Sequence, residues 1–299
     1  MKPAPFNYLA PASLDAALAL KAKHGDEAKF LAGGQSLVPA MNFRLVQASW
    51  LVDLNGLGEL DFIRLGDGGE LRIGAMTRQR RLERDPLVAR HAPLLHEAMP
   101  FIAHPQIRNR GTLGGSLAHA DPAAELPVIA LALDARVRVQ STRGERWISA
   151  AEFFLGLFTT ALAPDEMLVE VALPPQPART GNAFVEFARR RGDYALMGVA
   201  ALVTLDAAGN CQRARLVYLN AGEGPVEARQ AAAQLEGQRP TPAALAAATR
   251  FAAENEINPL GNVHASPAYQ RHLANVLTRR ALERAVERAG QADSKAHPA

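Results

Sequence analysis

Two glycine-rich segments contain the residues of this 299-residue sequence that are best suited to bind an anion: Ala32-Gly33-Gly34-Gln35-Ser36, which follows a short apolar run, and Thr112-Leu113-Gly114-Gly115-Ser116. A double glycine lets the backbone turn with positive φ and present successive N–H groups to an anion. The flanking hydroxyl groups could add neutral donors. Neither segment has the lysine of a P-loop or the G-x-G-x-x-G fingerprint of a Rossmann fold.

Either segment alone could be a simple turn before a helix, because glycine pairs are common in turns. Together, in two different lobes, they predict a diphosphate held from both sides, and hence a dinucleotide in the cleft between the lobes. Asp121 and Glu125 follow the second segment and open a predicted helix, of which Asp121 could be no more than the N-cap.

The composition excludes several classes of protein. Lys+Arg 33 against Asp+Glu 30 leaves a net charge of +3, too small for a nucleic-acid groove. The one cysteine, Cys211, cannot form an intrachain disulfide, and this chain alone cannot ligate an iron–sulfur cluster through cysteines. The first residues lack an apolar signal core, and no apolar run reaches the ~18 residues of a membrane span. We therefore expect a cytoplasmic protein without a transmembrane segment.

The pattern of apolar residues and breakers predicts three regions and a tail. Residues 1–57 read as strand, helix and strand, a small α/β lobe, and residues 58–177 as a second, α+β lobe. A linker over 176–180 leads to residues 178–290, where three strands precede three alanine-rich helices. Residues 291–299 are predicted to be a disordered tail.

The segments Ala32–Ser36 and Ile107–Glu125 closely resemble the FAD-binding medium subunit of molybdenum hydroxylases, the family of xanthine dehydrogenase and aerobic carbon monoxide dehydrogenase. The resemblance covers roughly residues 3 to 288. It implies an α+β fold, in which a two-lobed FAD-binding domain of the vanillyl-alcohol-oxidase (PCMH) type is followed by a C-terminal domain with a three-stranded antiparallel sheet and a helical bundle.

The resemblance also implies which residues contact FAD. The two glycine loops would hold the diphosphate, and Glu125 would contact the ribityl or adenosine part. Ile102 and the backbone at Leu168 would line the flavin, while Tyr194 either stacks on the ring or is a half-buried strand residue. The expected cofactor-binding set is Phe30, Leu31, Ala32, Gly33, Gly34, Gln35, Ser36, Leu37, Ile102, Thr112, Gly114, Gly115, Ser116, Asp121, Glu125, Leu168 and Tyr194. No catalytic side chain and no metal ligand is expected in this chain.

The implied function is electron transfer. A molybdopterin cofactor in a large partner subunit would supply electrons to [2Fe-2S] clusters in a small partner subunit. FAD in this chain would take the electrons from these clusters and pass them to an external electron acceptor. The expected assembly is a dimer of heterotrimers. Two alternatives stay open: a stand-alone FAD-dependent reductase of the same fold, and a non-enzymatic assembly protein that has lost flavin. The organic substrate and the final acceptor are not specified by this sequence.

Overall fold

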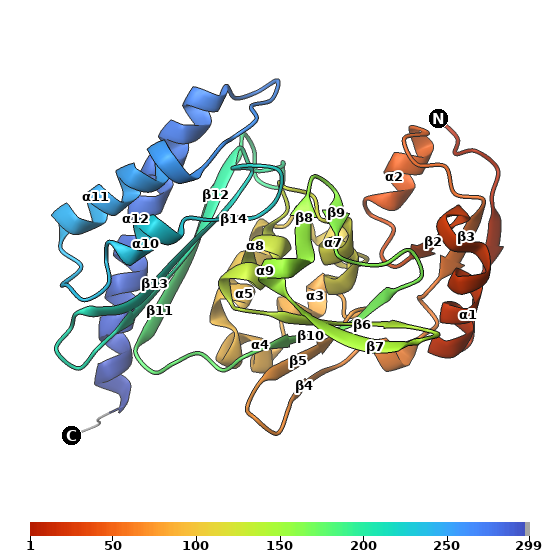
Figure 1. Cartoon of the computed structure of the whole chain (residues 1–299), viewed down its shortest axis with the longest axis horizontal. Coiled ribbons are helices and arrows are strands. Elements are labelled where there is room, and N and C mark those ends of the chain that lie inside the picture. The colour runs from red at the N-terminus through yellow and green to blue at the C-terminus, as the bar shows by residue number, and fades with distance from the viewer. Residues whose placement is uncertain (297–299) are drawn as a thin grey trace.

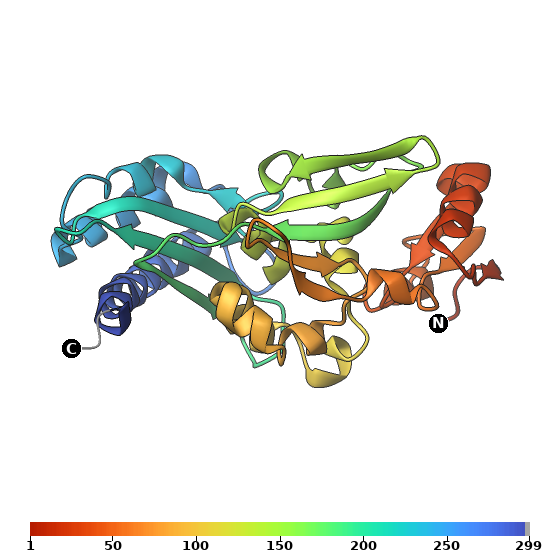
Figure 2. The ribbon, with the colours of Figure 1, turned by 90° about the horizontal axis from the view of Figure 1, so that it is seen from below.

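The chain forms three parts that lie in a row, each built around its own β-sheet (Figure 1 and Figure 2). The structure is a computed structural model that describes residues 1–296, with side chains as far as Gln291. Among these residues, no helix combines the length and the apolar character that crossing a membrane requires.

The first part, lobe 1, is a three-stranded parallel sheet of order β1-β3-β2 with α1 packed against it. Its elements are β1 (Asn7–Leu9), α1 (Leu14–His24), a 3-10 turn (Gly25–Glu27), β2 (Ala28–Leu31), α2 (Leu37–Asn42) and β3 (Trp50–Asp53). The Ser13 side chain accepts the Ala16 N–H at 3.2 Å and so caps α1. The strand β1 was not predicted, because it is short and mostly exposed.

The second part, lobe 2, is a five-stranded antiparallel sheet of order β4-β5-β10-β6-β7 with helices over one face. Its strands are β4 (Ile63–Leu65), β5 (Leu71–Gly74), β6 (Arg136–Ser141), β7 (Gly144–Ser149) and β10 (Met167–Leu173), with the separate hairpin β8 (Phe154–Gly156) and β9 (Thr159–Thr160). Its helices are α3 (Gln79–Leu82), α4 (Pro86–His91), α5 (Pro93–Ala98), α6 (Pro105–Arg108), α7 (Leu113–His119), α8 (Glu125–Ala132) and α9 (Ala150–Phe153), with 3-10 turns at Gly58–Leu60 and Met99–Phe101.

The third part, the C-terminal domain, contains the three long antiparallel strands that the resemblance implies, and a two-residue fourth strand at the edge. Its elements are β11 (Thr180–Phe187), β12 (Met197–Leu205), β13 (Cys211–Leu219), β14 (Val226–Glu227), α10 (Arg229–Ala233), α11 (Pro242–Phe251), a π-helical turn (Ala252–Glu256) and α12 (Pro267–Ala296).

The prediction of a disordered tail is wrong for residues 291–296, which continue α12, whereas residues 297–299 lie outside the described residues. The sequence there holds good helix formers, and its one break, Gly290, costs a helix only about 1 kcal/mol.

The C-terminal sheet is buried on both faces. One face shares a core with lobe 2, to which Phe184, Leu202 and Leu219 belong, and the other packs on α10 to α12. Lobe 1 has a separate, smaller core, which lobe 2 completes with Met76 and Met167. Lobe 2 and the C-terminal domain are therefore packed as one body, and lobe 1 closes against it. The domain limits at residues 57 and 177 stay a prediction.

Candidate functional site

A cavity of about 630 Å³ lies between lobe 1 and lobe 2 and extends to the loop that joins β11 to β12. This volume is in the range of sites for dinucleotide-sized ligands. The residues that the sequence assigned to the cofactor line it, except Leu31: Phe30, Ala32, Gly33, Gly34, Gln35, Ser36, Leu37, Ile102, Thr112, Gly114, Gly115, Ser116, Asp121, Glu125, Leu168 and Tyr194. The side chain of Leu31 instead packs beside Gly34, 3.2 Å from the position of an added Cβ. Contact of these residues with a cofactor stays a prediction.

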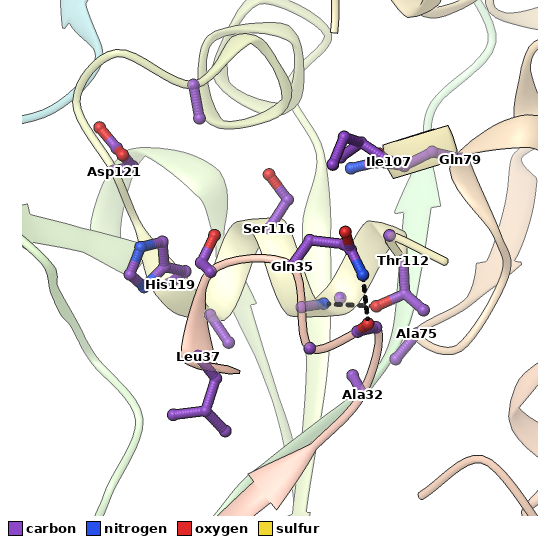
Figure 3. Close-up of a pocket in the computed structure, with 18 of the residues that line it drawn as sticks. Ala32, Gln35, Leu37, Ala75, Gln79, Ile107, Thr112, Ser116, His119 and Asp121 are labelled. Carbon is purple, nitrogen blue, oxygen red and sulfur yellow. Dashed lines mark hydrogen bonds between the residues drawn. The ribbon is translucent and has the colours of Figure 1, made fainter. Parts of the chain in front are cut away.

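The first glycine loop has the free donors that the sequence predicts. Within the described chain, no main-chain N–H of residues 33–37 donates a hydrogen bond to another residue, and the first to do so is that of Val38, to the Gly34 oxygen at 3.1 Å. Gly34 has φ +75°, which glycine adopts without strain. The Gln35 side chain donates to the Gly33 oxygen at 3.0 Å and closes the turn (Figure 3). The loop therefore presents five neighbouring N–H groups beside the cavity.

The second glycine segment works differently, and the prediction that Gly114 and Gly115 present free N–H groups is wrong. The Gly114 N–H donates to the Ala75 oxygen at 2.9 Å, and the Gly115 N–H to Oγ1 of Thr112 at 3.1 Å (Figure 3). Thr112 is the N-cap of α7, and the donors of the first turn are taken up by its hydroxyl group and by the main-chain oxygens of Ala75 and Thr77. The hydroxyl hydrogens of Thr112 and Ser116 are the polar groups that this segment can offer.

The glycines of both segments allow main chain to approach main chain. A Cβ at Gly33 would overlap the carbonyl oxygen of Arg110 and lie 2.8 Å from Cα of Gly111, and one at Gly114 would lie 2.6 Å from Cβ of Ala75. Since each overlap is with backbone or a Cβ, no rotamer change could relieve it. The two turns thus lie together, as the sequence predicts, but contact between their backbones holds them there.

Side chains from both lobes fasten this contact. Nδ2 of Asn55 donates to the Ala32 oxygen at 3.1 Å. The Arg78 guanidinium donates to Oδ1 of Asn55 at 2.5 Å and also to the Arg110 oxygen. Arg78 belongs to lobe 2, so one cation bridges the two turns across the interface between the lobes. Its guanidinium donors are directed at protein oxygens, and Arg78 does not line the cavity.

The walls beyond the glycine turns are apolar. Ile102 and Leu168 are 8% and 5% exposed and face the cavity. Leu168 precedes a bulge in β10, where the register with β6 shifts between Leu168 and Glu170. Tyr194 enters from the β11–β12 loop and is 72% exposed. A planar aromatic group of a ligand could therefore lie between these apolar walls and Tyr194.

The buried carboxyl group of Glu125 and the half-buried ones of Asp121 and Glu186 lie toward the Tyr194 end of the cavity. The sequence allowed Asp121 to be the N-cap of the predicted helix, but α8 begins only at Glu125. Oδ1 of Asp121 instead accepts the Ala123 N–H at 2.9 Å in the preceding turn. Burial, with the charge of Asp121 adding to it, raises the pKa of Glu125 to about 7. Burial, with the charge of Glu125 adding to it, raises the pKa of Glu186 on β11 to about 9.

Sequence reasoning missed Gln79, which lines the cavity beside Ile107 (Figure 3). The residue is 5% exposed, and its Oε1 has no hydrogen-bond partner among the described residues. Its carboxamide occupies the space that a side chain at Gly111 would fill, since a Cβ added to Gly111 would lie 2.5 Å from Oε1 of Gln79. An unpaired buried amide costs about 1–3 kcal/mol, which a polar ligand can offset. A single glutamine among arginines at the start of α3 gives no signal of this in the sequence.

Two lysines and two histidines also line the cavity: Lys21, Lys29, His104 and His119. Nζ of Lys21 donates to the Gly25 oxygen at 2.7 Å and to the Ala28 oxygen at 2.8 Å, so this ammonium is held by main chain. The cavity thus combines polar donors with apolar walls. The free amides, the hydroxyl groups and the unpaired carboxamide fit the diphosphate of FAD, and the apolar walls fit its flat ring.

Family models match nearly the whole chain. Residues 4–176 match the FAD binding domain in molybdopterin dehydrogenase, and residues 182–285 match the CO dehydrogenase flavoprotein C-terminal domain. The chain belongs to the family of FAD-binding medium subunits of molybdenum hydroxylases. Its cofactor is therefore FAD, and the resemblance read from the sequence is confirmed.

Individual relatives agree with this family along their full length. The chain is 45% identical to the 6-hydroxypseudooxynicotine dehydrogenase complex subunit alpha of Paenarthrobacter nicotinovorans, over 97% of both chains. It is 36% identical to the carbon monoxide dehydrogenase medium chain of Afipia carboxidovorans, over 97% of this chain and 99% of that one. A solved structure of carbon monoxide dehydrogenase from Hydrogenophaga pseudoflava superposes with a TM-score of 0.93 at 36% identity, covering 96% of this chain and 99% of its own.

The close approach at Gly33 predicts the effect of adding one methyl group. Gly33→Ala should weaken FAD binding by about tenfold or more and destabilise the protein by about 1–3 kcal/mol, because the added Cβ must displace the main chain at Arg110. Fluorescence titration of the apoprotein with FAD and urea unfolding measure the two effects. Gly58→Ala is the control, since nothing lies within 4 Å of its Cβ position; equal behaviour of the two variants would contradict the packing argument.

The unpaired amide of Gln79 predicts two effects of opposite sign. Gln79→Met keeps the size of the side chain and removes the polar atoms, so the apoprotein should be as stable as the parent or more stable, by up to about 1 kcal/mol. FAD affinity should nevertheless fall by about tenfold, because a polar contact is lost. Thermal unfolding of the apoprotein and FAD titration test both. A less stable apoprotein that binds FAD normally would assign Gln79 a structural role only.

The raised pKa of Glu186 predicts how stability depends on pH. The folded protein keeps a proton on this carboxyl up to about pH 9, whereas the unfolded chain releases it near pH 4.5, so the free energy of unfolding falls as pH rises between these values. Glu186→Gln removes this loss, and its advantage in apoprotein stability should grow by about 1–3 kcal/mol from about pH 5 to pH 9. The exposed Glu254→Gln is the control for urea unfolding at each pH. An advantage independent of pH would refute the shift.

Proposed function

We propose that this chain is the electron-exit subunit of a molybdenum hydroxylase complex. A large subunit with a molybdopterin cofactor supplies electrons to [2Fe-2S] clusters in a small partner subunit. The FAD of this chain receives the electrons from these clusters and delivers them to an external acceptor. The observation that carries the proposal is the cavity in which the free amides of residues 33–37 meet α7. The assembly we propose is a dimer of heterotrimers in the cytoplasm.

The residues of this chain would bind and orient the cofactor. The amides of residues 33–37, with the hydroxyl groups of Thr112 and Ser116, would hold the diphosphate. Ile102 and Leu168 would exclude water from the ring, with Tyr194 beside it. Bound FAD supplies the redox chemistry, and no side chain of this subunit needs to act as a nucleophile.

We also propose that the chain retains protons near the flavin, because the pKa values of Glu125 and Glu186 are raised. At neutral pH, Glu186 holds its proton, and Glu125 is close to half-protonated. Glu125, which lines the cavity, and Glu186, which interacts with it, would therefore retain protons near the proposed ring site. Electron uptake by a cofactor there would have a source of protons close by.

The cysteine count supports the assignment of the clusters to a partner. With Cys211 alone, and that thiol buried, the chain cannot supply the cysteine ligands of an iron–sulfur cluster. Any iron–sulfur cluster that reduces the FAD of this chain must therefore belong to another chain.

Electron delivery by a partner can be tested without knowing the organic substrate. The FAD-loaded chain is mixed anaerobically with the small subunit, which has been reduced with dithionite and freed of excess reductant. We expect the flavin absorbance of this chain to bleach. The small subunit kept oxidised is the control for mixing, and Gly58→Ala is the matched variant that should bleach like the parent.

Three outcomes would count against the proposal. Reduction by NADPH without any partner would favour a stand-alone reductase. A chain that stays colourless when FAD is added would favour an assembly protein. A flavin that binds but is not bleached by the reduced small subunit would exclude that subunit as the electron donor.

A further inference from the structure

Tyr194 lies beside the cavity on a loop in which Gly192 packs on the His104 ring but the tyrosine itself is exposed. The residue is 72% exposed, and its hydroxyl group makes no hydrogen bond within the described chain. The loop joins β11 to β12 and carries the exposed residues Arg189 to Arg191. Where the phenol ring lies relative to the cavity therefore depends on how the main chain around it is fixed.

Asn220, just after β13, fixes that main chain from one side. Its Nδ2 donates to the Ala195 oxygen at 2.9 Å and to the Leu196 oxygen at 3.3 Å. Its own main-chain N–H donates to the Pro122 oxygen at 2.7 Å, in the turn between Asp121 and Glu125. One residue thus joins the loop of Tyr194 to the turn that carries the cavity carboxyls.

Gln270 on α12 holds the same point from the other side. This fully buried side chain donates through Nε2 to the Leu196 oxygen at 3.0 Å, and its Oε1 accepts the Gly261 N–H at 2.9 Å. The Leu196 N–H donates to the Phe187 oxygen at 2.8 Å and closes the base of the loop. The donors of this network, Nδ2 of Asn220, Nε2 of Gln270 and the Leu196 N–H, all have partners, and paired buried groups favour one conformation.

The backbone of Asn220 also favours this arrangement. Its φ is +55°, in the left-handed region that asparagine adopts more readily than other non-glycine residues. The conformation points the main-chain N–H to Pro122 while the side chain reaches the end of the Tyr194 loop.

We propose that Asn220 is a positioning residue, which holds the loop of Tyr194 against the FAD ring and connects it to the segment of Asp121 and Glu125. Gln270 supports the same loop through its bond to the Leu196 carbonyl. The proposal rests on the proposed function, because it takes the cavity to be the FAD site. Asn220 acts through Tyr194 and has no contact of its own with the cavity, which it does not line.

Asn220→Gly separates the two halves of the interaction. Glycine tolerates the positive φ and keeps the N–H bond to Pro122, but the two bonds to Ala195 and Leu196 are lost. In the FAD-loaded protein we expect a shifted flavin absorbance band and a flavin fluorescence about fivefold less quenched by tyrosine. Asn210→Gly, in the β12–β13 turn, is the control and should leave both unchanged.

A double-mutant cycle shows whether the effect passes through the tyrosine. In a Tyr194→Leu background, Asn220→Gly should change the flavin spectrum no further. A full spectral change in that background, or an unchanged spectrum in the single variant with lower stability only, would overturn the proposal.

A second measurement needs no FAD and therefore separates this proposal from the proposed function. Loss of the anchor should expose the peptide bonds at Arg189 to Arg191, so trypsin should cleave the Asn220→Gly apoprotein there about fivefold faster than the parent. Unchanged cleavage would contradict the anchoring even if FAD binds. Faster cleavage of the Asn220→Gly variant, in a protein whose parent does not bind FAD, would support the anchoring role of Asn220 and refute the proposed function.

Discussion

The structure depends on one contact between two turns of main chain, made where side chains are absent. Gly33 lies against Arg110 and Gly111, and Gly114 lies against Ala75. The Gly33 contact lets lobe 1 approach lobe 2 until the first loop faces α7 across the cavity, and the Gly114 contact seats α7 against the end of β5 within lobe 2. The amides of residues 33–37 then remain the donors without a protein partner, and an unpaired row of donors beside a cavity requires an anion or water.

The C-terminal domain completes the site although the glycine turns lie far from it in sequence. Its sheet is buried on both faces, and one of these packs into the core of lobe 2. That shared core fixes β11 and β13, and with them Glu186, Asn220 and the Tyr194 loop, relative to the cavity. The domain therefore acts as a rigid support that brings a carboxyl group and an aromatic ring to a site formed by the two lobes.

The sequence predicts local features well, because they depend on a few neighbouring residues. A double glycine after an apolar run predicts the first loop, and three strands followed by helices in the C-terminal domain match the predicted order of elements. The second glycine pair was misread because its donors are satisfied by Thr112 and by Ala75, which lies 39 positions earlier in the chain. Gln79 and Asn220 gain their importance from Gly111 and Pro122, contacts that no local pattern contains.

The cavity is polar but holds few charges that are free to act on a ligand. Arg78 is bonded to Asn55, and Lys21 to Gly25 and Ala28, whereas Lys29, which also lines the cavity, has no hydrogen-bond or ion-pair partner among the described residues. Toward the Tyr194 end, burial raises the pKa of Glu125 to about 7 and that of Glu186 to about 9. Main-chain dipoles are fixed in place by the fold, so they stabilise a diphosphate without the desolvation and ordering of long charged side chains. The small net charge of the chain agrees with the proposal that fixed main-chain amides, more than long cationic side chains, hold the diphosphate.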